Sequence, residues 1–203
     1  MSEKNEKTLA VISQPRFMPA LNYLHRMEFA DLFIYLDNVR YTARDWENRN
    51  KIKTPEGPQW ISVPVKRIGQ DMRICDTFID NEQNWPRKII GSLKQNYGHA
   101  PYFKDYMPFF EDCLTQRWER LIDLNAHIVD YACRCLDIQC DFVRASELGI
   151  ESTGETLLMD ICKKLNVDIY ISGPHGRAYL QKKNWEKAGI DLVFHDYIYP
   201  VYP

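Results

Sequence analysis

The sequence predicts an α/β protein built on a mostly parallel, Rossmann-like sheet. Short apolar runs, which are typical of buried strands, alternate with longer segments of helical period, and this alternation favours a parallel sheet. The first strand–helix–strand segment spans residues 9–37, where two apolar runs flank a stretch with apolar residues at helical spacing. Such a βαβ unit has parallel strands, and its crossover is expected to be right-handed.

The other elements follow in order along the chain. Alternating apolar and polar residues predict a small antiparallel hairpin at about residues 51–65, and three stretches of helical period predict a helical insertion at about 85–136. Further strands are predicted at residues 74–79, 138–143, 168–172 and 190–194, and further helices at residues 153–165 and 179–187. We expect one domain over residues 1–203, because 203 residues can bury a single sizeable core.

The charge, the apolar runs and the cysteines of the chain indicate which kinds of binding partner are not expected. The net charge of −2 gives no general case for binding nucleic acid, and no apolar run approaches the roughly 20 residues that span a bilayer. The charged start, MSEKNEK, is unlike a secretory signal, so we expect a cytoplasmic protein with reduced thiols. The six cysteines lack zinc-site spacing, so no metal site is predicted. The sequence indicates neither a cofactor nor an oligomeric state, and we expect a small-molecule substrate.

Two loops are predicted at the carboxyl edge of the sheet, where ligands bind in open parallel folds. Gln14 and Pro15 follow the first strand and Asp37 follows the second. The Gln14 amide can donate and accept hydrogen bonds, and Asp37 can hold a ribose hydroxyl. The alternatives are a connection stiffened by proline and a carboxylate that caps a turn.

A third edge loop follows the strand predicted at residues 168–172. Gly173 would let the backbone approach a ligand closely, while Arg177 and Tyr179 would contact it. His175 in this loop and His25 in the first helix are candidate catalytic acids or bases. The alternatives are a simple glycine turn and a histidine that hydrogen-bonds within a helix interface.

Residues 40–53 form a basic and aromatic segment. Arg44, Arg49 and Lys53 could hold a phosphate or carboxylate, Trp46 could stack on a base or sugar, and Asn48 adds an amide. The alternative is a solvated loop whose charges face water. Because the segment is short and the whole chain slightly acidic, we do not predict nucleic-acid binding.

The sequence resembles the WbqC-like family over nearly its whole length. The resemblance rests on motifs at residues 14–19, 23, 31, 37, 46, 48–49, 52–53, 60–64, 85, 97–103, 124–125, 170–173, 179–180, 189–190 and 200–202. Phe17 and Tyr23 belong to the first of these motifs and are expected, through the resemblance, to line the binding site. The family occurs among genes for surface polysaccharide and O-antigen synthesis.

The resemblance implies a transferase that modifies a nucleotide-linked sugar, with acyl or aminoacyl transfer to a sugar amine as one version. His25 or His175 would then be the base, the three cations Arg44, Arg49 and Lys53 would hold the diphosphate, and Gln14 and Asp37 would orient the sugar or ribose.

Two alternatives stay open. The first loop is also similar to that of HxGH-type nucleotidyltransferases, which implies a nucleotidyltransferase-like fold and an enzyme that activates a small acid or sugar with ATP or CTP. However, Ala20 and Tyr23 stand where both histidines of that motif would be. The other alternative is a binding protein of a glycan-synthesis complex that has no catalytic activity.

Overall fold

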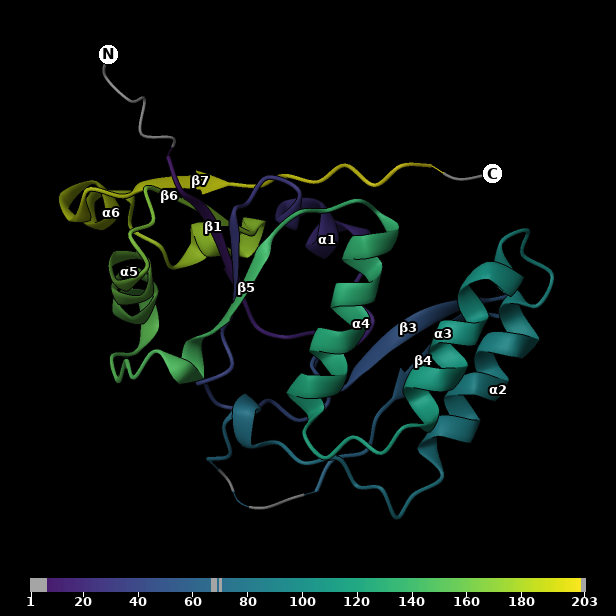
Figure 1. Cartoon of the computed structure of the whole chain (residues 1–203). Coiled ribbons are helices and arrows are strands. Elements are labelled where there is room, and N and C mark those ends of the chain that lie inside the picture. The colour runs from purple at the N-terminus through teal and green to yellow at the C-terminus, as the bar shows by residue number, and fades with distance from the viewer. Residues whose placement is uncertain (1–6, 67–68, 70, 202–203) are drawn as a thin grey trace. The chain divides into compact units, whose positions relative to one another are not determined.

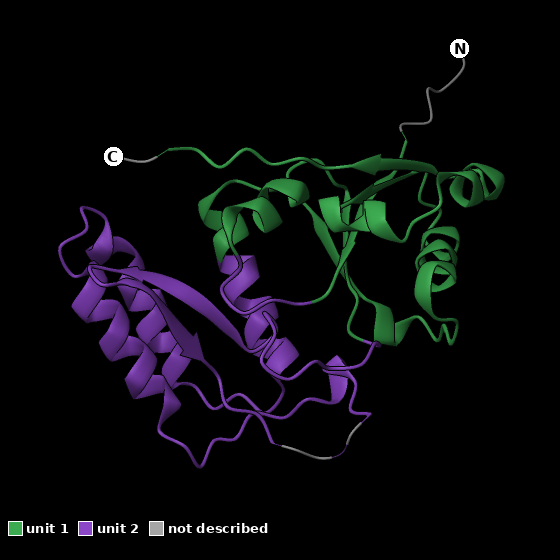
Figure 2. Ribbon diagram, turned by 180° about the vertical axis from the view of Figure 1, so that it is seen from behind, with its two compact units in different colours: residues 1–14, 20–37, 132–203 green, residues 15–19, 38–131 purple. Residues whose placement is uncertain are grey.

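The computed structural model describes residues 7–66, 69 and 71–201, and Tyr202 of the last motif lies outside them. The chain divides into two compact units (Figure 2). Unit 1 comprises residues 1–14, 20–37 and 132–203, and unit 2 comprises residues 15–19 and 38–131. Among the described residues, every helix is too short or too polar to cross a bilayer.

Unit 1 is built on a five-stranded sheet in the order β5-β2-β1-β6-β7, and every neighbouring pair is parallel (Figure 1). Its strands are β1 (Leu9–Ser13), β2 (Leu32–Tyr35), β5 (Asp141–Arg144), β6 (Ile169–Ser172) and β7 (Asp191–Phe194). The predicted parallel α/β sheet is therefore confirmed. β1 and β2 are paired in register, with Val11 opposite Phe33, and both of these side chains are fully buried.

The helices of unit 1 connect these parallel strands. They are α1 (Leu21–Met27), α5 (Gly154–Lys164) and α6 (Lys182–Ala188), with short 3-10 turns η2 (Ala145–Glu147) and η3 (Pro174–Ala178) after β5 and β6. The helix predicted from residue 179 begins only at Lys182, because the chain after β6 first forms η3. α6 ends at Gly189, whose φ of 74° is the left-handed conformation that closes many helices.

Unit 2 contains the predicted hairpin and most of the predicted helical insertion. The hairpin consists of β3 (Arg49–Thr54) and β4 (Gly57–Ser62), which pair antiparallel. It packs beside α2 (Trp85–Tyr97), which in turn packs against α3 (Phe103–Thr115). Its turn needs Gly57, where φ is 111°. α4 (Leu121–Cys135) begins in unit 2, and its last four residues belong to unit 1.

The strand predicted at residues 74–79 is wrong. Residues 74–76 form the 3-10 turn η1 (Ile74–Asp76), and only isolated bridges follow, at Phe78 and Ile79. Ile74 and Cys75 are both buried, so the apolar side chains do not alternate between two faces as a strand requires.

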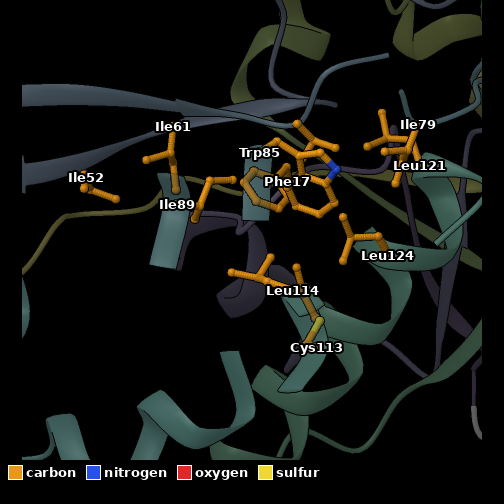
Figure 3. Close-up of a cluster of buried hydrophobic side chains, with 12 residues drawn as sticks. Phe17, Ile52, Ile61, Ile79, Trp85, Ile89, Cys113, Leu114, Leu121 and Leu124 are labelled. Atoms are coloured by element: carbon orange, nitrogen blue, oxygen red, sulfur yellow. The ribbon is translucent and has the colours of Figure 1, made fainter. Parts of the chain in front are cut away.

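An apolar cluster forms the core of unit 2 (Figure 3). Its twelve buried residues come from β3, β4, α2, α3, α4 and the loops between elements: Phe17, Ile52, Ile61, Val63, Ile79, Trp85, Ile89, Cys113, Leu114, Leu121, Leu124 and Ile128. Each large side chain buried in this way stabilises the fold by about 1.5–3 kcal/mol before entropy is subtracted. Phe17, expected to line the binding site, is instead fully buried and ties its loop to this core.

We predict that Gly176→Ala destabilises the protein by about 1–3 kcal/mol, the usual cost of forcing extra volume into a packed interior. A Cβ at Gly176 would lie 2.2 Å from Ser172 Oγ and 2.9 Å from Leu180 Cδ1. The matched control is Gly91→Ala on exposed α2, where a Cβ meets nothing within 4 Å. Urea unfolding should show Gly91→Ala stabilised by about 0.5–1 kcal/mol through helix propensity; equal effects of the two variants would contradict the prediction.

Candidate functional site

The carboxyl edge of the unit 1 sheet carries three of the predicted site residues. Gln14, Asp37 and Gly173 follow the ends of β1, β2 and β6, which are neighbouring parallel strands. Because parallel strands end at the same edge, these three residues lie along one side of the sheet. The shared sheet edge expected for these three residues is thus present in unit 1, and their role in ligand binding stays a prediction.

Asp37 is engaged within the protein. Its side chain is fully buried, and its two oxygens accept hydrogen bonds from the backbone N–H and the hydroxyl of Ser146, at 2.8 and 2.7 Å. The carboxylate therefore links the end of β2 to η2, the turn that follows β5. This arrangement favours the turn-capping alternative, and a role in ligand binding stays a prediction.

His25 lies in a hydrogen-bonded pair that the sequence did not indicate. Its Nδ1 is 2.7 Å from Nε2 of His195, which follows β7, so one nitrogen must carry the proton and the other must accept it. Burial lowers the pKa of His195, and the nearby His25 and Arg26 lower it further. Tyr23 is also buried here, and its hydroxyl donates to the backbone oxygen of Gln14.

Two predicted site residues of the loop after β6, Gly173 and Arg177, are explained by contacts within the protein. A Cβ at Gly173 would lie 2.7 Å from Nη1 of Arg26, so the glycine makes room for that guanidinium. Arg177 is paired with both carboxylate oxygens of Asp196, at 2.7 and 2.8 Å. His175 and Tyr179 are exposed.

A polar cavity of about 520 Å³ lies entirely within unit 2. It is lined by Arg44, Asn48, Arg49, Gln59, Trp60, Ile61, Ser62, Val63, Pro64, Gln83, Trp85, Lys88, Ile89 and Ser92. Its described lining thus contains three cations and no Asp or Glu. Three predicted site residues, Arg44, Asn48 and Arg49, meet here, while Lys53 lies outside the lining.

Arg49 is held in place by the ring of Trp60. Its guanidinium carbon lies 4.0 Å from the centre of the Trp60 ring, a close cation–π contact, and the Trp46 ring lies 5.3 Å from that of Trp60. Asn48 is fixed beside it, since its Nδ2 donates to the backbone oxygen of Val63 at 2.8 Å. The side chains that line the cavity at this end are therefore preorganised.

Neither Arg44, Arg49 nor Lys88 forms an ion pair with any residue in the described part of the chain. Three unpaired cations around one cavity favour an anionic ligand, and arginine can hold a phosphate through two parallel hydrogen bonds. Lys88 was missed from the sequence, although its spacing from Trp85 and Ser92 places all three on one side of α2.

Arg44 has a backbone conformation that L-residues rarely adopt, with φ at 63°. We predict that Arg44→Gly raises the free energy of unfolding by about 1 kcal/mol by relieving this strain, and weakens anion binding because it removes a cation. Arg44→Ala should weaken binding equally without the gain in stability. Urea unfolding and phosphate titration of both variants check this, and equal stabilities would show that the strain is absent.

Glu47 is a buried carboxyl next to the cavity residues in sequence. It is only 2% exposed, and burial raises its pKa to about 7, with the charge of Asp45 adding to the effect. Asn125, also buried, donates to the backbone oxygen of Glu47 at 2.8 Å. Burial thus favours the protonated form of this carboxyl group relative to an exposed glutamate.

Three predicted site residues remain to be placed: Pro15, Trp46 and Lys53. Pro15 is buried, and Trp46 lies outside the described cavity lining, although it contacts Trp60. Lys53 is exposed on β3, and its backbone N–H donates to the hydroxyl of Tyr97 at 2.8 Å. Among the described residues, no three His, Cys, Asp or Glu side chains are grouped so that they could hold a metal ion.

Fold and cavity together define an α/β protein with a parallel sheet and, in its second unit, a cationic cavity suited to an anionic ligand. The chain belongs to the WbqC-like protein family, whose sequence profile matches residues 14–203. It is also 30% identical over 193 residues to the uncharacterized protein Rv1507c of Mycobacterium tuberculosis, covering 94% of this chain and 83% of that protein. No solved structure matches the chain significantly.

Proposed function

We propose that the protein is a transferase that modifies a nucleotide-linked sugar for a surface polysaccharide, and that the unit 2 cavity holds the diphosphate of that substrate. The observation that carries this proposal is the set of unpaired cations, Arg44, Arg49 and Lys88, in a cavity whose described lining has no acid. A diphosphate offers several acceptor oxygens to these side chains, so it can contact more than one cation at once.

Three further features support this proposal. A cavity of about 520 Å³ lies within the range of pockets that hold small molecules. Its neutral donors and acceptors, among them Gln59, Gln83 and Ser92, suit the hydroxyl groups of a sugar or ribose. The WbqC-like family resemblance associates the chain with surface polysaccharide synthesis.

In the proposed reaction, the amine nitrogen of the sugar attacks the carbonyl carbon of an acyl or aminoacyl donor. A new C–N bond forms, the bond from that carbon to the leaving group breaks, and a base removes the amine proton. The assignment of this base to His25 or His175 stays a prediction. No nucleophile of the chain is required, because the acyl group passes directly to the amine.

A thermal-shift screen against UDP-, dTDP- and GDP-sugars, ATP, CTP and acyl-CoA tests the proposal. A nucleotide-linked sugar at about 100 times its dissociation constant should add roughly 2.7 kcal/mol to the stability of the fold. Stabilisation by ATP or CTP with release of pyrophosphate would favour nucleotidyl transfer instead. Stabilisation by a nucleotide-linked sugar without turnover with any acyl donor would favour a non-catalytic binding protein.

A further inference from the structure

We infer that a second ligand, an acidic oligosaccharide, binds along the exposed face of the β3–β4 hairpin with one end at the cavity. The inference rests on the proposed function, because Arg49 belongs both to the cavity and to this face. It adds a second substrate class to the nucleotide-linked sugar: the anionic glycan chain itself.

The hairpin carries a row of three cations, of which Lys51 and Lys53 are exposed and Arg49 is half-buried. Arg49, Lys51 and Lys53 alternate along β3 with Asn50 and Ile52, so their side chains share one face of the strand. The opposite face is the buried one, since Ile52 and Ile61 belong to the apolar core of unit 2. Residues two apart on a strand are about 6.8 Å apart, so the three cations extend over about 14 Å.

These cations are not neutralised by ion pairs within the described part of the chain. Neither Arg49, Lys51 nor Lys53 forms an ion pair with a described residue. Opposite them on β4 lie Ser62, Trp60 and Pro58, none of which is charged. A row of like charges destabilises the isolated protein slightly and attracts a partner that carries several negative charges in line.

Trp60 lies at the centre of this face and contacts two of its cations. It is 39% exposed, lies directly opposite Lys51 in the hairpin register, and has Arg49 at 4.0 Å and the Lys51 ammonium at 4.9 Å from its ring centre. Both cations are therefore held beside one ring, and the row begins at the cavity, where Arg49 also lies. A chain with one anionic end in the cavity could place its next acidic groups on Lys51 and Lys53.

The same contacts argue against single-stranded nucleic acid as the partner. Such ligands gain much of their affinity from bases stacked on open aromatic faces. The ring of Trp60 already has Arg49 and Lys51 over it and Trp46 at 5.3 Å, so a base that stacked on this ring would compete with those two cations. Carboxylates of an acidic sugar chain need only the cations and the hydroxyl-binding groups beside them.

Oligogalacturonates of one to six residues test the inference by isothermal titration, with fully methyl-esterified hexamer as the uncharged control. We expect affinity to rise at least tenfold from monomer to hexamer, and the esterified hexamer to bind no better than the monomer. In the Lys51→Ala/Lys53→Ala double variant this rise should fall to twofold or less. The charge-matched control Arg87→Ala/Lys104→Ala alters exposed cations elsewhere in unit 2 and should keep it.

Affinity independent of length in the wild-type protein would overturn the inference without any variant having to fold. Tighter binding of oligo-dT than of the hexamer, with the same dependence on Lys51 and Lys53, would also overturn it in favour of nucleic acid. The proposed function fails separately, if no nucleotide-linked sugar binds. If a nucleotide-linked sugar binds but the affinity for oligogalacturonate does not depend on its length, the proposed function remains. Only the inferred oligosaccharide site on the β3–β4 hairpin would then be wrong.

Discussion

Arg49→Ala is expected to weaken the binding of a nucleotide-linked sugar by about 10- to 100-fold. Hydrogen bonds to charged groups contribute about 1.5–3 kcal/mol each, and that range corresponds to this loss. The structure holds Arg49 in place, because its guanidinium carbon lies 4.0 Å from the ring centre of Trp60. Isothermal titration with the best nucleotide-linked sugar from the thermal-shift screen measures the effect.

Two further variants serve as controls for Arg49→Ala. Arg49→Lys keeps the charge but loses the planar fork that binds phosphate through two hydrogen bonds, so we expect an intermediate loss. Arg87→Ala removes an exposed cation of α2 that lies outside the described cavity lining, next to Lys88, and should bind like the wild type. Equal affinities of wild-type protein and Arg49→Ala would remove Arg49 from the site.

Glu47→Gln is expected to abolish most of a pH-dependent loss of stability. The pKa of Glu47 is raised from 4.5 to about 7 by burial, so between these values the folded state binds more protons than the unfolded state. The free energy of unfolding therefore falls as pH rises through this window. At about 1.4 kcal/mol per pKa unit, the upper limit of the loss above pH 7 is about 3–4 kcal/mol.

The measurement is urea unfolding at pH 5 and pH 8. Glu47→Gln should be close to wild type at pH 5 and more stable than wild type at pH 8, because the glutamine cannot ionise. Glu56→Gln, which alters an exposed carboxyl in the turn of the β3–β4 hairpin, is the matched control and should follow the wild type at both pH values. Should Glu47→Gln also follow the wild type at both values, Glu47 would be titrating normally.

The parallel sheet could be predicted because its signals are local. Strands buried on both faces appear as short apolar runs, and the helices between them have a different period, so the order of elements is visible in the chain. The positions of Gln14, Asp37 and Gly173 along one sheet edge then follow from the topology. The strand predicted at residues 74–79 failed because a short apolar run alone does not define a strand.

Most side-chain partners could not be predicted, because they are distant in sequence. Asp37 is held by Ser146, 109 residues later, and His25 by His195, 170 residues later. Lys88 lines the cavity from α2, which is distant in sequence from the basic segment that contains Arg44 and Arg49. Residue spacing indicates which side chains can share a helix or strand face, but it does not indicate which elements pack together.

A crystal structure of the protein with the nucleotide-linked sugar that gives the largest thermal shift tests the central claim most directly. The proposed function requires the diphosphate to lie in the unit 2 cavity, within hydrogen-bond distance of Arg49 and of at least one of Arg44 and Lys88. A diphosphate bound instead at the carboxyl edge of the unit 1 sheet, beside Gln14 and Gly173, would contradict it.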